Sequence, residues 1–387
     1  MKQLYIGLIS GTSIDCIDAA LVDCSEDKPI LLMHHEHSID LPTKQSIAAL
    51  CLPGDNEIER MGQLDLQLGC LFADAVNQLL AKAKLNYKDI TAIGSHGQTI
   101  RHRPPKNTDS PGFTLQIGDA NTIAEKTQIT TVADFRRRDM AAGGQGAPFA
   151  PAFHKAIAPS NIDTSVFLNL GGIANITLVH QNNIVSGFDT GPANGLMDAW
   201  ILKHKNKPFD NNGEWAKSGK VNKPLLAQLK EHRYFSMAAP KSTGREEFHL
   251  PWLESILGSV AEDLATKDQP KISNEDVQAT LLRFSCETII DAVLDISAKL
   301  QYQPSVIYCC GGGARNAFFL ETLQAICNSS NTNIRITNTD ELGIGADWVE
   351  ACAFAWLAKQ RIEKQAISLQ TVTGAKHDVI AGCIYSA

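Results

Sequence analysis

Two strand pairs in this sequence enclose turns made of glycine and small polar residues. The first pair covers residues 6–23, and the second covers 166–179 with Gly171 and Gly172 between its strands. Glycine lets a backbone approach a ligand closely, and the amides of such a turn can point at an anion. A third glycine run, 311–313, follows an apolar strand and precedes a predicted helix, whose N-terminus favours negative charge. Together these elements predict a nucleotide held between two related lobes.

These turns are the phosphate-binding candidates because the chain contains neither a G-x-x-x-x-G-K-[ST] loop nor a G-x-G-x-x-G fingerprint. The alternatives are an ordinary β-turn with surface hydroxyls for the first turn and a flexible connection for the third run. Three consecutive glycines cost conformational entropy, which favours a functional role. The residues expected at the nucleotide are Gly11, Thr12, Ser13, Ile14, Asp15, Cys16, Ile17, Asp18, Gly171, Gly172, Gly311, Gly312, Gly313 and Asn316. Asp15 is also the candidate contact to Mg²⁺, through water, because carboxylates organise hydrated magnesium.

Asp189 follows an apolar strand, residues 184–188, and precedes a Gly-Pro turn. An α/β fold places reacting groups at the ends of its strands, so this carboxylate is expected to face the cleft. The alternative is an aspartate that initiates a turn or caps a helix, which Asp-Thr-Gly-Pro also fits.

The composition narrows the class of protein. The 387 residues suffice for two domains, and 44% hydrophobic with 20% charged residues is typical of a soluble globular protein. A net charge of −7 argues against a nucleic-acid partner. No apolar run approaches the roughly 18–20 residues of a membrane span, and no signal peptide is evident. The ten cysteines lack Cys-x-x-Cys spacing, which predicts reduced thiols in a cytoplasmic protein.

Strand and helix patterns alternate along the chain, which predicts an α/β fold of two lobes, 1–145 and 146–387. The first lobe is expected to carry a helix at 58–85 and strands at 90–94, 114–117 and 129–135. The second is expected to carry helices at 195–204, 276–301 and 347–360, a strand at 305–310 and an irregular insertion at about 206–252. The last helix could also pack back on the first lobe.

In order and type, the three glycine elements resemble the two phosphate loops and the adenosine loop of the actin-like ATPase superfamily. That resemblance implies a two-lobed, duplicated ribonuclease H-like fold with an ATP cleft between the lobes. A closer resemblance is to the anhydro-N-acetylmuramic acid kinases. The stretches that carry it are 11–18, 95–99, 118–119, 133–136, 143–148, 169–176, 189–194, 241–246 and 311–313. One departure is Cys16, which stands where the family usually has glycine and would narrow the first phosphate turn.

The resemblance implies an enzyme that uses ATP and Mg²⁺ to open the 1,6-anhydro ring with water and phosphorylate O6. The product would be N-acetylmuramic acid 6-phosphate, an intermediate of cell-wall recycling. Asp189 falls on the family's catalytic aspartate and would activate the water. The residues expected at the amino sugar are His96, Gln98, Arg136, Asn194 and Glu341. The resemblance also implies a homodimer, for which the insertion is one candidate surface.

Arg136 is the first of three consecutive arginines, and a guanidinium binds a carboxylate, such as the lactyl group of this sugar, bidentately. The alternative is a solvated surface run, but the neighbouring stretch 142–147 is too apolar for that and favours one or two arginines in the cleft. His96 and Gln98, expected at the end of a strand, are also compatible with purely structural roles. Two other functions remain open: a plain sugar kinase, and a nucleotide-switched binding protein, against which the lack of a separate β-sandwich segment counts.

Overall fold

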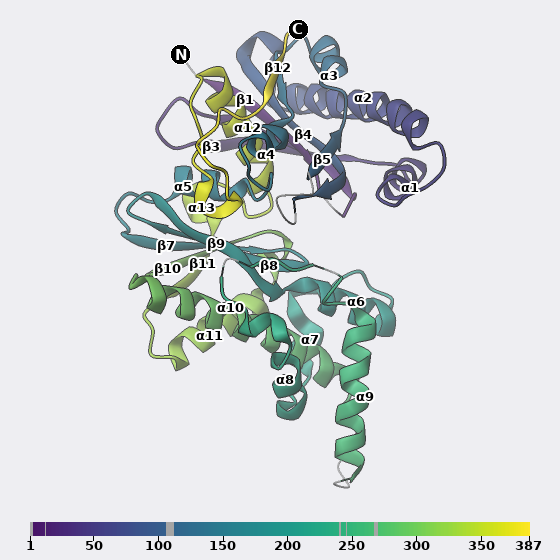
Figure 1. Ribbon diagram of the computed structural model, residues 1–387, viewed down its shortest axis with the longest axis vertical. Coiled ribbons are helices and arrows are strands. Elements are labelled where there is room, and N and C mark those ends of the chain that lie inside the picture. The colour runs from purple at the N-terminus through teal and green to yellow at the C-terminus, as the bar shows by residue number, and fades with distance from the viewer. Residues whose placement is uncertain (1–2, 12, 106–111, 240, 245, 267–269) are drawn as a thin grey trace. The chain divides into compact units, whose positions relative to one another are not determined.

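Two β-sheets, each in its own compact unit, form the framework of this protein (Figure 1). The computed structural model describes residues 3–11, 13–105, 112–239, 241–244, 246–266 and 270–387. The first unit combines the chain up to Ile157 with the segment from Trp348 onward, and the second spans Ala158–Asp347. The division therefore falls at 157/158 and 347/348, where the sequence alone suggested one boundary at 145/146.

The first sheet has the strand order β12-β6-β4-β1-β2-β3, and β5 pairs with β4. Its strands are β1 (Leu4–Ser10), β2 (Cys16–Asp23), β3 (Ile30–Ser38), β4 (Ile90–Arg103), β5 (Phe113–Ile117), β6 (Thr131–Ala133) and β12 (Cys383–Tyr385). The first three form an antiparallel meander, and β4 and β6 then add in parallel on the other side of β1.

The second sheet repeats this plan. Its order is β11-β10-β7-β8-β9, built from β7 (Thr164–Leu170), β8 (Ile173–His180), β9 (Asn183–Pro192), β10 (Val306–Cys310) and β11 (Arg335–Asn338). Here too an antiparallel meander is followed by two strands that add in parallel beside its first strand. The shared topology confirms the predicted α/β fold with a duplicated sheet.

Helices cover both sheets. Those of the first unit are α1 (Leu41–Leu50), α2 (Glu57–Ala83), α3 (Ala120–Thr127), α4 (Phe135–Ala141), α5 (Ala150–Ile157), α12 (Val349–Ile362) and α13 (Gln370–Thr373). Those of the second are α6 (Asn194–Lys205), α7 (Glu214–Ser218), α8 (Lys223–Lys230), α9 (Leu250–Thr266), α10 (Asn274–Leu300) and α11 (Ala317–Ser329). Short 3₁₀ turns include η3 (Arg233–Ser236) and η4 (Gly312–Arg315).

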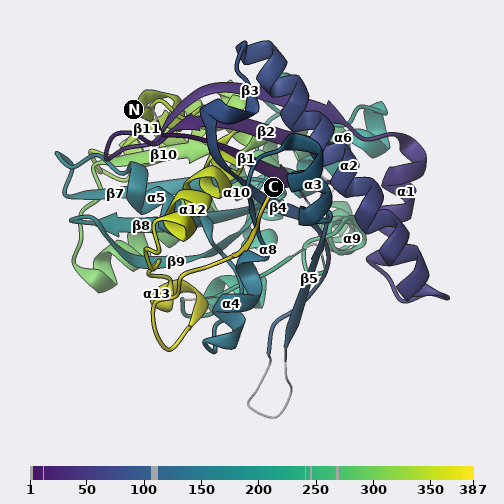
Figure 2. The ribbon, with the colours of Figure 1, turned by 90° about the horizontal axis from the view of Figure 1, so that it is seen from above.

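Strand β1 is buried on both faces because its side chains share a core with α2 on one face of the sheet and α12 packs against the other (Figure 2). Ile6 and Leu8 share one core with Leu68 of α2. A side chain on Gly7 would point to the opposite face of the sheet, against α12. The helix is so close there that a Cβ would lie 1.8 Å from the carbonyl oxygen of Ala351. The absence of a side chain at this position is therefore what allows the helix to lie on the sheet.

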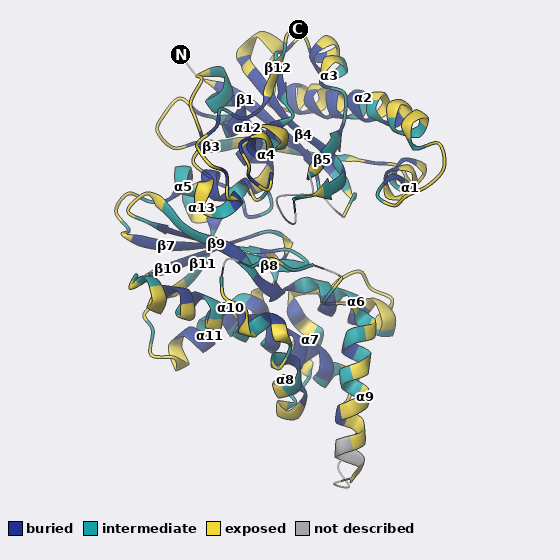
Figure 3. Ribbon diagram, viewed as in Figure 1, coloured by how far each residue is buried: buried dark blue, intermediate teal, exposed yellow. Residues whose placement is uncertain are grey.

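In the second unit, α10 supplies the largest share of the core. Its residues Phe284, Ile289 and Val293 are buried together with Val166 and Leu168 of β7. Figure 3 shows the difference in burial between this core and the outer helices: β7 is mostly dark blue, whereas much of α9 is yellow. The buried strands β7 and β10 thereby provide a rigid base for the glycine turns at their ends.

Three sequence expectations need correction. Strand β4 does not end at Gly94 but continues to Arg103, because its later half pairs with β5. The segment expected as a strand at 129–135 is extended only over β6, and α4 begins at Phe135. The insertion at 206–252, in which the sequence predicted some helix, is more regular than expected in its described part, because α7, α8 and η3 form there and α9 starts within it.

Candidate active site

The first glycine turn joins β1 to β2. The N–H of Ile14 donates to the carbonyl oxygen of Gly11 at 3.2 Å. Ile14 has a φ of 59°, which is a costly backbone conformation for a β-branched residue and marks a constrained turn. Thr12 lies outside the described residues, whereas Ser13 and Asp15 are exposed beside the turn. The exposed positions are the ones that can meet a phosphate or a hydrated cation.

The remaining residues of this turn are less exposed. The Ile17 side chain is fully buried in the core, so only its main chain is available to a ligand. The Cys16 thiol donates to Asp18 Oδ1 at 3.2 Å. Burial, followed by the negative charge of Asp18, raises the pKa of this thiol to about 12, so it stays protonated. Cys16 therefore contributes a neutral hydrogen-bond donor beside the turn.

The second turn, the start of α6 and the triple glycine meet in one place. Asn194 donates its side-chain amide to the carbonyl oxygens of Leu170 and Gly171, at 2.8 and 2.9 Å. A Cβ on Gly313 would lie 2.6 Å from this Asn194 amide nitrogen. The N–H of Gly195 donates to the carbonyl oxygen of Gly172 at 3.0 Å. Asn194, expected at the sugar, thus joins the two glycine elements expected at the nucleotide.

The triple glycine needs glycine for steric reasons. Gly311 has a φ of 79°, and a Cβ there would lie 2.3 Å from the Asn169 Oδ1 atom. At Gly312, in contrast, a Cβ would meet no heavy atom within 4 Å, so this side of the run is open. Asn316 caps α11 by accepting a hydrogen bond from the N–H of Phe319. An open glycine before a capped helix start is suited to a flat ligand lying against the backbone.

Asp189 is held at both its main chain and its side chain. Its Oδ2 atom accepts hydrogen bonds from Ser242 Oγ at 2.8 Å and from the N–H of Thr243 at 3.1 Å. Its N–H donates to the carbonyl oxygen of Lys241 at 3.0 Å, and its carbonyl oxygen accepts a 2.5 Å hydrogen bond from the Tyr234 hydroxyl. Asp189 lies within β9, not after it as expected, because the ladder with β8 continues through the pair Asn175 and Asp189.

The surroundings of Asp189 raise the pKa of its carboxyl, because they partly exclude water from it. Burial raises the pKa of its carboxyl above the ordinary aspartate value, while the hydrogen bonds from Ser242 and Thr243 oppose that rise. Glu246 adds a smaller upward contribution through its negative charge. A carboxylate with a raised pKa is a better proton acceptor near neutral pH than an exposed aspartate.

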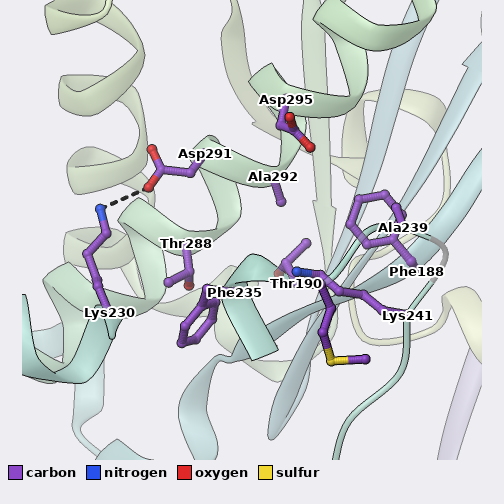
Figure 4. Close-up of a pocket in the computed structure, with 11 residues that line it drawn as sticks. Phe188, Thr190, Lys230, Phe235, Ala239, Lys241, Thr288, Asp291, Ala292 and Asp295 are labelled. Carbon is purple, nitrogen blue, oxygen red and sulfur yellow. Dashed lines mark hydrogen bonds and ion pairs between the residues drawn. The ribbon is translucent and has the colours of Figure 1, made fainter. Parts of the chain in front are cut away.

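A pocket of about 160 Å³ opens beside the same strand (Figure 4). Its wall includes Phe188 and Thr190, which flank Asp189, but not Asp189 itself. Lys230 binds Asp291 across one side of this pocket at 2.8 Å. Neighbouring residues of a strand point to opposite faces, so the pocket lies on the face of β9 opposite to the Asp189 carboxylate.

In the first unit, the buried His96 and the half-buried Arg136 form a pair. Arg136 Nε donates to His96 Nε2 at 2.9 Å, and Arg136 Nη1 donates to the carbonyl oxygen of Gly146 at 2.8 Å. Because Nε2 is an acceptor, the His96 proton is on Nδ1, which lies 3.0 Å from the carbonyl oxygen of Gly97. Burial, and then the charge of Arg136, lowers the pKa of His96 well below its ordinary value. The imidazole is neutral and orients a guanidinium that retains its charge.

Of the three consecutive arginines, only Arg136 points inward. Burial lowers the pKa of Arg136 to about 10, which leaves it cationic at neutral pH. Arg137 is exposed and pairs with Asp134 at 3.1 Å, and Arg138 is exposed as well. Two of the three arginines, Arg137 and Arg138, are therefore solvated, and Arg136 is the one that is partly buried.

Gln98 connects the long strand β4 to the first glycine turn. Its Oε1 atom accepts a 2.6 Å hydrogen bond from the Ser10 hydroxyl, and its Nε2 atom donates to Thr99 O at 3.1 Å and to Gly11 O at 3.4 Å. His96 and Gln98 are both inside β4, so neither ends a strand as the sequence suggested. Gln98 therefore lies at the first glycine turn rather than beside Arg136.

Glu341 is an exposed residue engaged in its own ion pair. Arg335 reaches both of its oxygens, at 2.7 and 2.8 Å, and the Thr337 hydroxyl binds one of them. These hydrogen bonds, of which the one from Arg335 has the largest effect, lower the pKa of Glu341.

A second acidic residue was missed by the sequence analysis: Glu350, in the first turn of α12. Desolvation raises the pKa of Glu350, and the charge of Arg136 opposes that rise.

Within the described residues, no group of three or more His, Cys, Asp or Glu side chains is arranged to hold a metal ion. In the same ranges, the search for a helix long and apolar enough to cross a bilayer found none.

The whole chain matches one protein family. The model of anhydro-N-acetylmuramic acid kinase matches residues 3–387. The chain belongs to the anhydro-N-acetylmuramic acid kinase family. A relative of that name from Shewanella sp. strain ANA-3 is 46% identical, over 100% of this chain and 99% of its own. Another from Saccharophagus degradans is 45% identical, over 99% of both.

The family assignment confirms the predicted membership and the predicted class of enzyme, a phosphotransferase. One solved structure, an activator of 2-hydroxyisocaproyl-CoA dehydratase from Clostridium difficile with bound ADPNP, is similar over 94% of this chain and 96% of that one. Its identity is 12% and its TM-score 0.44. The fold of the present chain is defined by its own two sheets.

Sequence reasoning missed the residues that hold Asp189. Tyr234, Ser242 and Thr243 lie 45 to 54 residues away along the chain. The stretch 241–246 stood out only through the family resemblance, which gave it no role. Glu350 had one usable signal, since it is the one acid of α12 and is followed by a run of mostly apolar residues.

Proposed function

We propose that this protein hydrolyses the 1,6-anhydro ring of anhydro-N-acetylmuramic acid and phosphorylates O6 at the expense of ATP. The product would be N-acetylmuramic acid 6-phosphate, formed in the recycling of cell-wall sugars in the cytoplasm. The observation that carries the proposal is the full-length family match together with Asp189, a residue held by four hydrogen bonds, two of them to its carboxylate, whose pKa is raised.

In the proposed reaction, Asp189 takes a proton from one water molecule as the water oxygen bonds to C1 of the sugar. The C1–O6 bond breaks, and O6 bonds to the γ-phosphorus of ATP as ADP leaves. Phosphoryl transfer depends mainly on positioning and on neutralising charge, which suits a site built from turn amides and one base. The protein's own contribution is therefore the orientation of water, sugar and phosphate.

ATP is assigned to the two glycine turns and the open triple glycine. Mg²⁺ usually keeps several waters and binds through phosphates and one or two carboxylates, so the exposed Asp15 fits an outer contact. When bound, the ion would supply neutralisation of the phosphate charge. The absence of a three-residue cluster in the described ranges is compatible with such a phosphate-held ion.

The sugar is assigned to Arg136 and the residues around it. A half-buried guanidinium with its Nε and Nη1 donors engaged still has donors for the lactyl carboxylate, because the fork carries five N–H groups. Glu350 is included because its carboxylate interacts with the same arginine. Glu341 stays a proposal from the family resemblance alone. From that resemblance we also propose a homodimer, which light scattering on the purified protein would test.

Reaction in ¹⁸O-water tests the hydrolytic step. The proposal predicts one ¹⁸O atom at C1 of the phosphorylated product in a rapidly quenched reaction. The control is unlabelled product kept in ¹⁸O-water for the same time, which measures exchange at the anomeric carbon. A product that keeps its anhydro ring and carries no solvent oxygen would indicate an ordinary sugar kinase. Equal ATP hydrolysis with and without sugar would indicate a nucleotide-switched protein.

A further inference from the structure

The carboxylate of Asp189 is bound through one of its two oxygens. Ser242 Oγ and the N–H of Thr243 both donate to Oδ2, at 2.8 and 3.1 Å. We propose that Ser242 is a positioning residue. Its hydrogen bond occupies Oδ2 of Asp189 and thereby directs Oδ1 toward the attacking water. This inference rests on the proposed function, in which Asp189 is the base.

The segment that carries Ser242 also holds the main chain of Asp189. The carbonyl oxygen of Lys241, one residue before Ser242, accepts from the N–H of Asp189 at 3.0 Å. The Tyr234 hydroxyl donates to the carbonyl oxygen of Asp189 at 2.5 Å. Tyr234 is itself tied to Lys241, whose ammonium donates to Tyr234 O at 2.9 Å and lies 4.5 Å from the centre of the ring. Contacts at the N–H, the carbonyl and Oδ2 together fix both the position and the rotation of the carboxylate.

The charges around Asp189 make the Ser242 hydrogen bond electrostatically important. Strand β8 presents Asn175 opposite Asp189 and no titratable group at that point. The titratable side chains on the other packed elements include Glu246, whose charge acts on Asp189, and Tyr234, Lys241, Glu247, Asp291 and Asp295. Four of these are acids, and the Lys241 ammonium is directed to Tyr234. Hydrogen bonds, rather than a neighbouring cation, therefore offset the burial of this carboxylate.

The first test is the pH dependence of kcat/KM in Ser242→Ala. Removing the hydroxyl removes a contact that lowers the pKa of Asp189, so the acidic limb should move to higher pH, by about one unit. At the plateau, kcat should fall about tenfold because Oδ1 is no longer oriented, while KM for ATP should change less than twofold. Ser236→Ala is the matched control, because Ser236 binds Arg233 O and not Asp189. An acidic limb identical to that of the unmodified enzyme would overturn the proposal.

Tyr234→Phe separates geometry from charge. This variant loses the hydrogen bond to the Asp189 carbonyl but keeps both contacts to Oδ2. We expect a roughly tenfold lower kcat with the acidic limb unmoved. Tyr302→Phe serves as the matched control, because Tyr302 stacks on His180. A shift of the acidic limb in Tyr234→Phe as large as that in Ser242→Ala would overturn the separate role given to Ser242.

A readout without turnover distinguishes this inference from the proposed function. NMR titration of ¹³C-labelled aspartate carboxyls, with Asp189→Asn to assign the signal, gives the Asp189 midpoint in the free enzyme. The inference predicts a higher midpoint in Ser242→Ala whether or not Asp189 is the base, and an unchanged midpoint would refute it. Retained turnover in Asp189→Asn would instead refute the proposed function.

Discussion

At the scale of single residues, the clearest interior charge is Arg136. A neutral histidine and a backbone carbonyl hold two corners of its guanidinium, at 2.9 and 2.8 Å, and leave the rest of the fork for a ligand. Lysine keeps the charge but has neither the planar fork nor the second fixed donor. The role of Arg136 therefore depends on its shape as much as on its charge.

Arg136→Lys should lower kcat/KM for the sugar at least tenfold and leave KM for ATP within about twofold, because a bidentate site loses its geometry. Steady-state kinetics with each substrate varied in turn measures both effects. Arg137→Lys is the matched control, since Arg137 is exposed and pairs with Asp134. Equal losses in the two variants would contradict a specific role for Arg136.

At the scale of elements, the docking of α12 on β1 and β4 depends on two glycines. A Cβ on Gly94 would lie 2.0 Å from the carbonyl oxygen of Phe354, and one on Gly7 would lie 1.8 Å from that of Ala351. Both clashes are with helix backbone, which cannot move without displacing the helix. Because Glu350 lies in the first turn of this helix and interacts electrostatically with Arg136, the docking also positions part of the candidate sugar site.

Gly94→Ala should destabilise the protein by about 2–3 kcal/mol, because overpacking a tight contact costs about that much. Urea unfolding measures the change. Gly62→Ala in α2 is the matched control: its Cβ would meet nothing within 4 Å, so the better helix former should stabilise the protein by up to about 1 kcal/mol. A neutral Gly94→Ala would mean that α12 does not rest on this strand as described.

Elements with a strong periodic pattern could be predicted from the sequence. The helix expected at 58–85 is α2, and the one expected at 276–301 is α10, because long apolar faces leave little ambiguity. Short helices such as α1 and α5 were missed, and β4 was cut short, because pairing with β5 is a tertiary event that a local pattern does not encode.

At the scale of the whole molecule, the same strand order occurs in two units, each with a glycine turn after its first strand. The sequence predicted this repetition because both hairpins carry local signals. The partners of the site residues could not be predicted, since they come from distant parts of the chain. Gln98 binds the turn at Ser10, Asn194 meets Gly313, and Ser242 binds Asp189. Only the folded topology brings such pairs together.

The most direct test of the account is turnover by Asp189→Asn. The carboxamide is nearly the same size as the carboxylate and can still accept the Ser242 hydrogen bond, but it cannot take a proton from water. With ATP and anhydro-N-acetylmuramic acid as substrates, we predict a fall in kcat of at least about 10²-fold, the lower range for a general base. ATP affinity and the melting temperature should stay at the values of the unmodified protein. A variant that turns over at the unmodified rate would contradict the assignment of Asp189 as the base.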